Sequence, residues 1–326
     1  MTEQRTIADH ETIAADPAFR ADVLAGLAAP QRAVPARWLY DRRGSELFEA
    51  ITDLPEYYPT RTETGILTAS GPDIAAKVGP GRAVVEFGSG SSAKTPLLLR
   101  AIAPAAYVPI DISGDFLRDS AATLAKEFPA VPVIPVEADF MEPITLPRAI
   151  RALPKLGFFP GSTIGNLVPR TSVDLLRAMR ESLGDDALLL IGMDRVKGED
   201  VLVPAYDDAA GITAAFNLNL LDRINRELGG TIPVDAFRHR AIWNETLTRI
   251  EMHLEATRDV NFTIDGHDFA MTAGETIHTE NSHKYGPRDA RMLLLAGEWT
   301  PVAEWTDADD RFALLLAEAR PRRKAP

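Results

Sequence analysis

One stretch decides the fold of this chain: Ala83-Val84-Val85-Glu86-Phe87-Gly88-Ser89-Gly90-Ser91-Ser92-Ala93-Lys94-Thr95. An apolar run contains an acid near its end, a Gly-x-Gly turn follows, and a helix start comes after it. This order predicts a buried strand, a tight turn and a helix N-terminus, an arrangement that binds nucleotide-like cofactors. Glycine permits the unusual dihedrals of such a turn and a close approach of the backbone to a ligand. Because Gly-x-Gly also closes purely structural turns, the neighbouring segments must decide between the two interpretations.

The composition of the 326 residues argues against several classes of function. A formal net charge of -12 disfavours a surface for nucleic acid or anionic membranes, since either needs clustered Lys and Arg. The basic residues at 320–324 are interpreted as a solvated tail. The chain has no cysteine, which excludes disulfides and thiolate metal sites. It shows no signal-peptide core and no apolar run of roughly 18 residues, so we expect a cytoplasmic protein, and a monomer.

The first 78 residues are predicted to form helices joined by a loop. Helical spacing of apolar residues predicts one helix before Pro30 and a second that carries Leu47, with Ser45 as its N-cap. In residues 54–60 two prolines bracket two tyrosines, which predicts a rigid loop. A helix over residues 62–78 then leads to the glycine stretch.

From residue 83 onward, apolar runs alternate with helical segments. The predicted strands cover residues 83–87, 106–110, 131–137, 155–160 and 187–192. Because these runs lack strict alternation of apolar and polar residues, they predict a parallel sheet that is buried on both faces.

The pattern changes after residue 197. Residues 198–232 are predicted to be helical, and residues 236–285 show a period of two, which predicts antiparallel strands with one solvated face. The pair Asp265-Gly266 predicts a hairpin turn. A helix and two strands, at 301–305 and 311–317, then return as an antiparallel edge of the first sheet.

These segments predict an α/β fold in which a Rossmann-like sheet carries a second α+β domain inserted before its last two strands. The first domain is assigned to residues 61–197 plus 286–326. The second is assigned to residues 1–60 plus 198–285, and we expect it to bind the substrate.

The carboxyl ends of parallel strands meet at one edge of a sheet, where ligands bind. This rule predicts that Gly88, Asp111, Asp139 and Asn166 lie together. Asp111 ends the second strand, where an acid can accept hydrogen bonds from ribose hydroxyls, and Asp139 ends the third, near the expected adenine. A lone strand-end aspartate is more often a helix N-cap, but these two and Glu86 behind a Gly-x-Gly turn favour a cofactor site.

Two cofactors fit this edge. Gly88-x-Gly90-x-x-Ala93 also matches the dinucleotide fingerprint, so NAD is an alternative. Against NAD, the sequence has no basic or Gly-rich extension for a second phosphate, and an acidic edge suits the sulfonium cation of S-adenosylmethionine. Lys94 either binds the methionine carboxylate of that cofactor or is a solvated helix residue.

Other residues point to an acceptor site. Tyr40, Tyr57, Tyr58 and Tyr206 lie in non-repetitive segments or at a helix start. Glu280 and Ser282 are two positions apart, so on a strand they face the same way, about 7 Å from each other, which suits the two nitrogens of an imidazole. Exposed Glu-x-Ser pairs without any function are common as well.

Longer stretches are more specific than the glycine turn: Trp38-Leu39-Tyr40-Asp41, Leu54-Pro55-Glu56-Tyr57-Tyr58-Pro59-Thr60-Arg61-Thr62-Glu63, Glu86-Phe87-Gly88-Ser89-Gly90, Gly161-Ser162-Thr163-Ile164-Gly165-Asn166, Ala205-Tyr206-Asp207-Asp208 and Arg249-Ile250-Glu251-Met252. In these stretches the chain resembles the ergothioneine-pathway L-histidine Nα-methyltransferases, which use S-adenosylmethionine to trimethylate histidine to hercynine. The resemblance runs over nearly the whole chain, from residue 38 to about residue 317.

The resemblance implies a role for each matching residue. Cofactor contacts are expected at Tyr40, Gly88, Lys94, Asp111, Asp139 and Phe140, and histidine contacts at Tyr57, Asn166, Tyr206, Met252, Glu280 and Ser282. We expect Tyr40 and Tyr57 to orient the amine, and we expect no metal. The sequence departs from the family pattern at Leu39, at His253 and around Ser282. Because His253 points opposite to Met252 on an alternating strand, it is interpreted as a surface residue.

Other functions remain compatible with the same fold. A methyltransferase could act on another amino acid or small amine, and a cofactor-binding regulatory or scaffold protein would not turn over at all. The Tyr and Asn residues expected at the edge of the sheet argue against a regulatory or scaffold protein.

Overall fold

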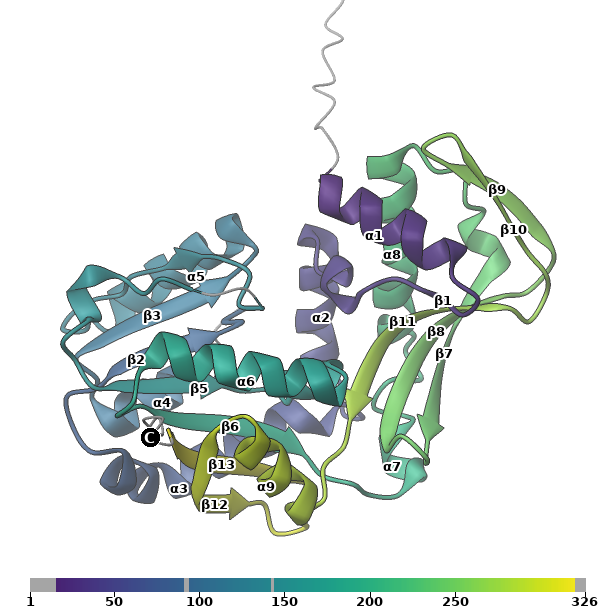
Figure 1. Cartoon of the computed structure of the whole chain (residues 1–326). Coiled ribbons are helices and arrows are strands. Elements are labelled where there is room, and N and C mark those ends of the chain that lie inside the picture. The colour runs from purple at the N-terminus through teal and green to yellow at the C-terminus, as the bar shows by residue number, and fades with distance from the viewer. Residues whose placement is uncertain (1–15, 91–93, 142–143, 320–326) are drawn as a thin grey trace, which may run out of the picture.

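The computed structural model describes residues 16–90, 94–141 and 144–319. These residues form two lobes that lie side by side, each built on its own β-sheet (Figure 1). Positions 91–93 of the glycine stretch and the basic tail at 320–324 lie outside the described residues.

The larger lobe contains a seven-stranded sheet in the order β12-β13-β6-β5-β2-β3-β4. Its parallel part consists of β2 (Ala83–Phe87), β3 (Ala106–Asp111), β4 (Val136–Glu137), β5 (Lys155–Phe159) and β6 (Leu188–Asp194). From β2 the chain adds strands first on one side and then on the other. The order therefore reverses beside β2, and the crevice above such a switch point is where ligands bind in α/β folds.

Helices cover both faces of this sheet. Val84 packs in the apolar cluster of α3 (Tyr58–Val78) and α4 (Thr95–Ile102), and the next residue, Val85, packs in the cluster of α6 (Pro169–Leu183) and α9 (Pro287–Ala296). A further helix, α5 (Gly114–Glu127), connects β3 to β4. Consecutive apolar residues thus bury opposite faces, and the predicted doubly covered parallel sheet is confirmed.

The two last strands form the predicted antiparallel edge. β13 (Phe312–Ala319) pairs antiparallel with β6, and β12 (Trp299–Thr306) pairs antiparallel with β13. The third predicted strand is shorter than expected, because Pro132 and Pro135 cannot donate ladder hydrogen bonds. Only the two residues of β4, and a single bridge from Val133, pair with β3.

The smaller lobe contains a four-stranded sheet in the order β1-β11-β8-β7. Its strands are β1 (Arg32–Ala33), β7 (Phe237–Asn244), β8 (Arg249–Ala256) and β11 (Thr276–His283). β9 (Val260–Ile264) and β10 (His267–Met271) form a separate hairpin. Its turn is Asp265-Gly266, where both residues have positive φ, as predicted.

The N-terminal helices belong to the smaller lobe. α1 (Pro17–Ala28), η1 (Ala36–Leu39) and α2 (Arg42–Thr52) share one apolar cluster with α8 (Ile212–Leu228) and with the strands of this sheet. In Figure 1 the purple helices accordingly lie beside the green part of the chain.

The α+β lobe enters the chain between β6 and the last two strands, which confirms the predicted fold class. The exact division at residues 60, 197 and 285 stays a prediction. Within the described residues, no helix combines the length and the apolar character that crossing a membrane requires.

Three local predictions for helices are wrong. α2 begins before Ser45, because the Asp41 side chain caps it by accepting the Gly44 N–H at 2.7 Å. The expected loop at 54–60 ends at Tyr58, where α3 begins with Pro59 in its first turn, a position that needs no N–H donor. The expected long helix at 198–232 consists of α7 (Glu199–Leu202), a turn region and α8.

The predicted solvated face of the antiparallel sheet is also wrong along β8. The polar alternates Glu251, His253 and Glu255 are each 7% exposed. Arginine side chains cover this face: Arg238 and Arg240 on β7 pair with Glu255, and Arg249 pairs with Glu251. Their apolar stems lie over the strand while their charges reach water. His253 is therefore a buried residue and not a surface residue.

Candidate active site

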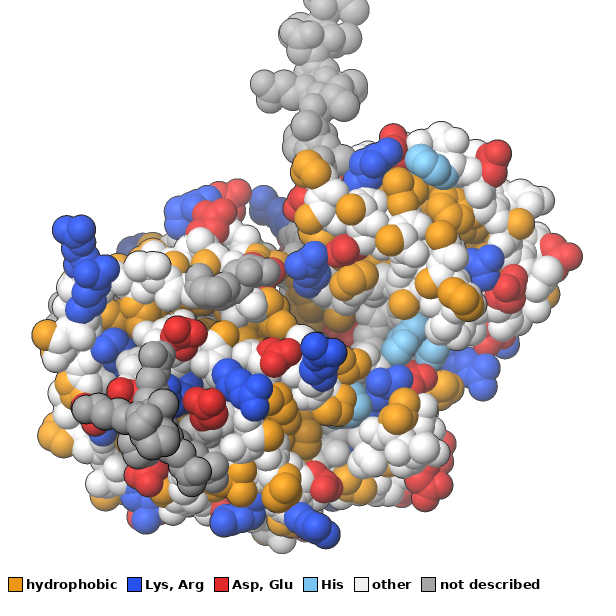
Figure 2. Space-filling model, in the orientation of Figure 1, with side chains coloured by type: hydrophobic (Ala, Val, Ile, Leu, Met, Phe, Trp, Pro, Cys, Tyr) orange, Lys and Arg blue, Asp and Glu red, His pale blue; other side chains and the backbone are white. Residues whose placement is uncertain are grey.

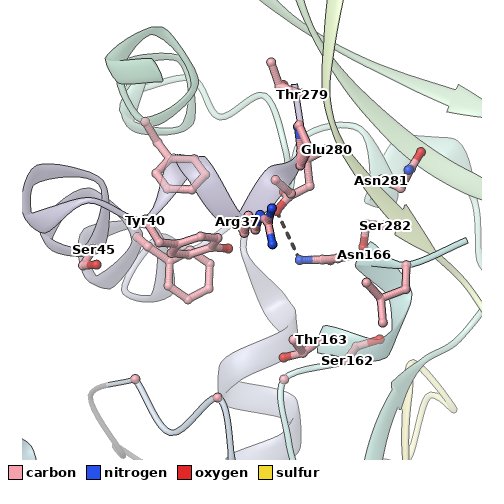
Figure 3. A pocket seen from close by; sticks show the side chains of 18 of the residues that line it. Arg37, Tyr40, Ser45, Ser162, Thr163, Asn166, Thr279, Glu280, Asn281 and Ser282 are labelled. Carbon is pink, nitrogen blue, oxygen red and sulfur yellow. Dashed lines mark hydrogen bonds between the residues drawn. The ribbon is translucent and has the colours of Figure 1, made fainter. Parts of the chain in front are cut away.

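One cavity of about 940 Å³ lies where the surface is hollowed between the two lobes (Figure 2). Its lining includes all the residues predicted for the site: Tyr40, Tyr57, Gly88, Lys94, Asp111, Asp139, Phe140, Asn166, Tyr206, Met252, Glu280 and Ser282. Figure 3 shows the Asn166 and Glu280 side chains pointing toward each other, with the Tyr40 ring on the other side of the opening. The structure brings the predicted residues together, while the role of each stays a prediction.

The glycine turn leaves room that a side chain would fill. Gly88 and Gly90 have φ values of 69° and 49°, and the N–H groups of Gly88 and Ser89 donate to the carbonyl of Ile110 at 2.9 and 3.0 Å. A Cβ atom on Gly88 would approach Cε1 of Phe140 to 3.1 Å. The backbone here is thus exposed to the cavity beneath an aromatic ring, a cradle that fits the adenosyl part of a cofactor.

The strand-end aspartates hold the loops of this edge. Asp111 accepts the N–H of Gly90 at 3.0 Å and that of Ser113 at 2.9 Å. Asp139 accepts the N–H of Met141 at 2.9 Å and faces Arg37 at 3.4 Å. Both aspartates therefore cap loops. Each carboxylate still has lone pairs that can accept hydrogen bonds from a ligand. Glu86 lies deeper, where Thr95 and Tyr107 each donate to it at 2.6 Å.

Lys94 is not a solvated helix residue. Its ammonium forms an ion pair with Glu63, which is fully buried on α3 and also accepts the Gly161 N–H at 2.9 Å. This pair fixes Lys94 at the cavity wall, where a positive charge suits the carboxylate of S-adenosylmethionine. The sequence analysis did not single out Glu63, although it lies within a stretch that carries the family resemblance.

Glu280 is the acid of the acceptor side. Asn166, which follows β5, donates from Nδ2 to Glu280 Oε1 at 3.2 Å (Figure 3). Burial raises the pKa of Glu280 to about 7, against the opposing effects of Lys284 and of Tyr40. The Glu280 carboxyl therefore titrates in the range of a free imidazole, whose pKa is ordinarily about 6.5.

Lys284 is a further residue of the site that the sequence analysis did not single out. Its buried ammonium donates to Tyr206 at 2.8 Å and to Ser282 at 2.7 Å, and these two hydroxyls lie 2.7 Å apart. The same ammonium pairs with Asp194, at the end of β6, at 2.7 Å. Lys284 is two positions after Ser282, so the period of two that selected Glu280 and Ser282 could also have found it.

The Asp194 carboxylate connects the two lobes. It also accepts hydrogen bonds from Lys197 at 2.6 Å and from Tyr58 at 2.7 Å. Burial by itself would raise the pKa of Asp194, but the ammonium groups of Lys284 and Lys197 lower it below its ordinary value. A buried charge of this kind needs such partners to remain ionised.

Aromatic residues form the remaining wall. The Tyr57 and Tyr206 rings meet edge to face at 6.0 Å, and Tyr40 packs against Phe48 and Phe216 at 5.6 and 5.4 Å. Burial raises the pKa of Tyr40, Tyr57 and Tyr206 well above the ordinary value, so all three keep their protons near neutral pH. In this form they can orient a substrate by hydrogen bonds.

The fold places the chain in a class. A solved S-adenosylmethionine-dependent methyltransferase from Clostridium acetobutylicum shares the fold with a TM-score of 0.50, over 85% of this chain and 99% of that one, at 9% identity. The chain therefore has the fold of this methyltransferase.

The family follows from the sequence as a whole. A family model of histidine-specific, S-adenosylmethionine-dependent methyltransferases matches residues 19–319, and the chain belongs to this family. This confirms the predicted family and removes the NAD alternative.

Individual relatives agree with this membership. The chain is 41% identical to the histidine N-alpha-methyltransferase of Mycolicibacterium smegmatis and 40% identical to that of Mycobacterium tuberculosis, in both cases over 92% of this chain and 94% of the relative. It is 30% identical to ergothioneine biosynthesis protein 1 of Neurospora crassa, over 89% of this chain and 33% of that protein. The predicted enzyme class, an N-methyltransferase that uses S-adenosylmethionine, is confirmed.

Proposed function

We propose that the enzyme transfers three methyl groups from S-adenosylmethionine to the α-amine of L-histidine and so forms hercynine, a step of ergothioneine synthesis. The relatives named as histidine N-alpha-methyltransferases and as an ergothioneine biosynthesis protein support this proposal. The observation that carries it is the hydrogen bond from Asn166 to Glu280. It joins the ligand-binding edge of the larger sheet to the strand that carries the expected imidazole contacts.

Glu280 and Ser282 recognise the imidazole in this proposal. The pKa of Glu280, raised to about 7 by burial, is close to that of the substrate ring, so one proton can be shared between them. Ser282 offers a hydroxyl to the other ring nitrogen, and its orientation is fixed by Lys284. Met252, which is 2% exposed on the neighbouring strand, packs against the ring.

Asn166 and Tyr206 hold the substrate carboxylate. Both supply hydrogen-bond donors, and the Lys284 ammonium behind the Tyr206 hydroxyl adds a positive charge on the side where the carboxylate lies. In a protein with a net charge of -12, a local cation of this kind favours an anionic group beside it.

Tyr40 and Tyr57 orient the α-amine. S-adenosylmethionine supplies an electrophilic methyl group on sulfur; the amine lone pair forms the N–C bond as the C–S bond breaks and its electron pair passes to sulfur. The residues contribute mainly by holding the amine in line, since proximity supplies much of the rate in such displacements. Each tyrosine remains protonated and accepts an N–H hydrogen bond from the amine.

The amine has to lose its proton before each transfer. An α-amino group has a pKa of about 7.7–8.0 in model peptides and a higher pKa in a free amino acid, so the site must favour the neutral amine, and water accepts the proton. The third transfer produces a quaternary ammonium that has no proton left to lose.

The test is a methylation assay with product masses. The purified enzyme is incubated with S-adenosylmethionine and an equimolar mixture of amino acids that contains L-histidine. We expect mono-, di- and trimethylated histidine to appear in turn while the other amino acids stay unmodified. Methylation of another amino acid in preference to histidine would contradict the proposal and favour the alternative substrate class.

A further inference from the structure

A group of possible metal ligands lies beside the cavity, on the smaller sheet. Glu251, His253 and His278 each offer a donor atom, and these atoms lie within 4.8 Å of one another. Glu251 and His253 alternate on one face of β8, and His278 is the partner of His253 on β11. The two imidazole rings stack with their centroids 4.7 Å apart and a 20° angle between their planes.

A β-bulge at Thr279 separates this group from the substrate contacts. His278 pairs with His253, whereas Glu280 pairs with Met252, so the register shifts by one residue between them. Without the bulge, His278 and Glu280 would face the same side; with it, they face opposite sides. Figure 3 likewise shows Asn281 pointing away from the region between Glu280 and Asn166.

Hydrogen bonds already orient the three side chains. Glu251 Oε1 accepts from Arg249 at 2.8 Å and from Asn244 at 2.9 Å, which leaves Oε2 facing His253 Nε2 at 3.1 Å. With the tautomer in which His278 Nε2 donates to the Glu280 carbonyl at 3.0 Å, the lone pair of its Nδ1 is available. A carboxylate anchored by a second shell and a histidine that donates its other N–H to a carbonyl are the usual surroundings of metal ligands.

The group also holds polar atoms without a partner. Among the described residues, His253 Nδ1 and Asn281 Oδ1 are buried and make no hydrogen bond, and Asn281 is the partner of Glu251 on β11. Of the three side chains, Glu251 and His253 are buried and His278 is part-exposed, so the group can be reached from solvent on the side of His278.

We propose that Glu251, His253 and His278 form a binding site for one divalent transition-metal ion of the Zn²⁺, Ni²⁺ or Cu²⁺ type. Two imidazoles and a carboxylate are the donors these ions prefer, and they differ from the oxygen ligands of Mg²⁺ and Ca²⁺. Ligation at about 2.0–2.2 Å requires the two imidazole rings to turn out of their stacked arrangement, because a metal–nitrogen bond lies in the plane of the ring. The Arg249 guanidinium bonds to Oε1 of Glu251, and an ion would replace the hydrogen bond that Oε2 makes with His253 Nε2.

Such an ion would link β8 to β11 next to the bulge. Because His278 is hydrogen-bonded to the main chain of Glu280, the ion would fix the strand segment that presents Glu280 to the cavity. The site is thus structural or regulatory, and it takes no part in methyl transfer.

A zinc titration tests the proposal. Full-length enzyme is treated with a chelator and titrated with ZnCl₂ by calorimetry in the absence of histidine, which itself binds zinc. We expect one Zn²⁺ per chain, and His253→Phe, which keeps an aromatic ring against His278, should weaken the affinity at least tenfold. The matched control is His267→Phe, an exposed histidine of the β9–β10 hairpin, which should leave the affinity unchanged. Absence of zinc binding, or equal affinity in both variants, would overturn the site.

A second measurement keeps the test valid if His253→Phe does not fold. X-ray absorption at the zinc edge of the wild-type enzyme should show scattering from two imidazoles and from oxygen ligands. A spectrum with no imidazole scattering would overturn the proposal without any variant.

Discussion

The two sides of the cavity are held together in different ways. On the cofactor side, Asp111 and Asp139 bond to backbone N–H groups of nearby loops, as in the contact from Gly90, 21 residues away in the chain. On the acceptor side, side chains bond to side chains across the lobes, as in the contact between Asn166 and Glu280, which are 114 residues apart. A local motif can specify the first kind of contact, whereas the second kind exists only after both lobes have folded against each other.

The difference extends to charge. Among the described residues, the acceptor side contains Lys284 and Asp194, a buried ion pair that Lys197 and Tyr58 complete. The aspartates of the cofactor side are part-exposed and accept backbone N–H groups, and Asp139 also faces the exposed Arg37 guanidinium. We therefore expect changes on the acceptor side to affect both stability and substrate affinity, and changes on the cofactor side to affect mainly the affinity for the cofactor.

The largest expected effect is that of Asp194→Asn. The substitution keeps the shape of the side chain but leaves the ammonium of Lys284 buried without its counter-ion, and breaking a buried ion pair costs about 3–5 kcal/mol. Urea denaturation should show a loss of this size in the free energy of unfolding. The control is Glu46→Gln, since Glu46 pairs with Arg42 and Arg43 on the surface, where such pairs contribute about 0–1 kcal/mol. Equal losses of unfolding free energy in the two variants would show that the buried pair stabilises the protein no more than a surface pair does.

The second prediction concerns pH and compares one buried acid from each side. Burial raises the pKa of Glu86 and of Glu280 from 4.5 to about 7. Because the folded pKa lies above the unfolded one, the stability from each protonated carboxyl is complete below about pH 4.5 and is lost as the pH rises through about 7. The free energy of unfolding should fall by on the order of 2–3 kcal/mol per group across this window.

Glutamine variants separate the two contributions. In urea denaturation between about pH 4.5 and pH 8, Glu86→Gln and Glu280→Gln should each remove one part of the slope, since an amide does not titrate there. Burial lowers the pKa of His239, His253, His278 and His283, and these rings add stability as the pH rises, so each variant is compared with the wild type. A variant whose slope equals that of the wild type would show that its carboxyl is already ionised in the folded protein.

The third prediction concerns substrate affinity. Glu280→Gln keeps an oxygen that can accept from Asn166 but removes the negative charge and the shared proton. Hydrogen bonds to charged groups contribute about 1.5–3 kcal/mol, so we expect histidine to bind roughly 10- to 100-fold more weakly, by calorimetry in the presence of S-adenosylhomocysteine. Glu245→Gln, in the exposed turn after β7, should change nothing. Equal weakening of histidine and S-adenosylhomocysteine would show that Glu280 supports the whole cavity and does not recognise the ring.

The same division explains how much could be predicted from the sequence. The strands of the larger sheet are apolar at every position because residues such as Val84 and Val85 bury opposite faces, and this signal is local. The glycine turn and the strand-end aspartates are local signals too. The roles of the acceptor residues came from the family resemblance, since spacing alone left Glu280 and Ser282 undecided.

The remaining errors and omissions are of tertiary origin. A period of two shows that His253 and Met252 face opposite sides of β8, but it does not show that Arg240 and Arg249 cover the polar side. The pairing of Lys94 with Glu63 joins the first turn of one helix to another, and the sequence carries no sign of the distance between them. Both Ser45 and Asp41 are residue types that cap helices, and the sequence does not show which of them begins α2. In the structure the cap is Asp41.

The smallest effect is expected for Gly88→Ala on the cofactor side. At φ 69° an alanine is strained, by roughly 1–2 kcal/mol, and its Cβ would approach Phe140 Cε1 to 3.1 Å. Gly184→Ala is the matched control, because Gly184 also has positive φ, at 95°, but has nothing within 4 Å of its Cβ position and lies outside the cavity. Both variants should lose similar stability, and only Gly88→Ala should weaken S-adenosylhomocysteine binding, by at least about tenfold, because its methyl group enters the cradle. If both variants bound the cofactor product equally well, the backbone at residue 88 would not contact it, and the cofactor side would depend on side chains as much as the acceptor side does.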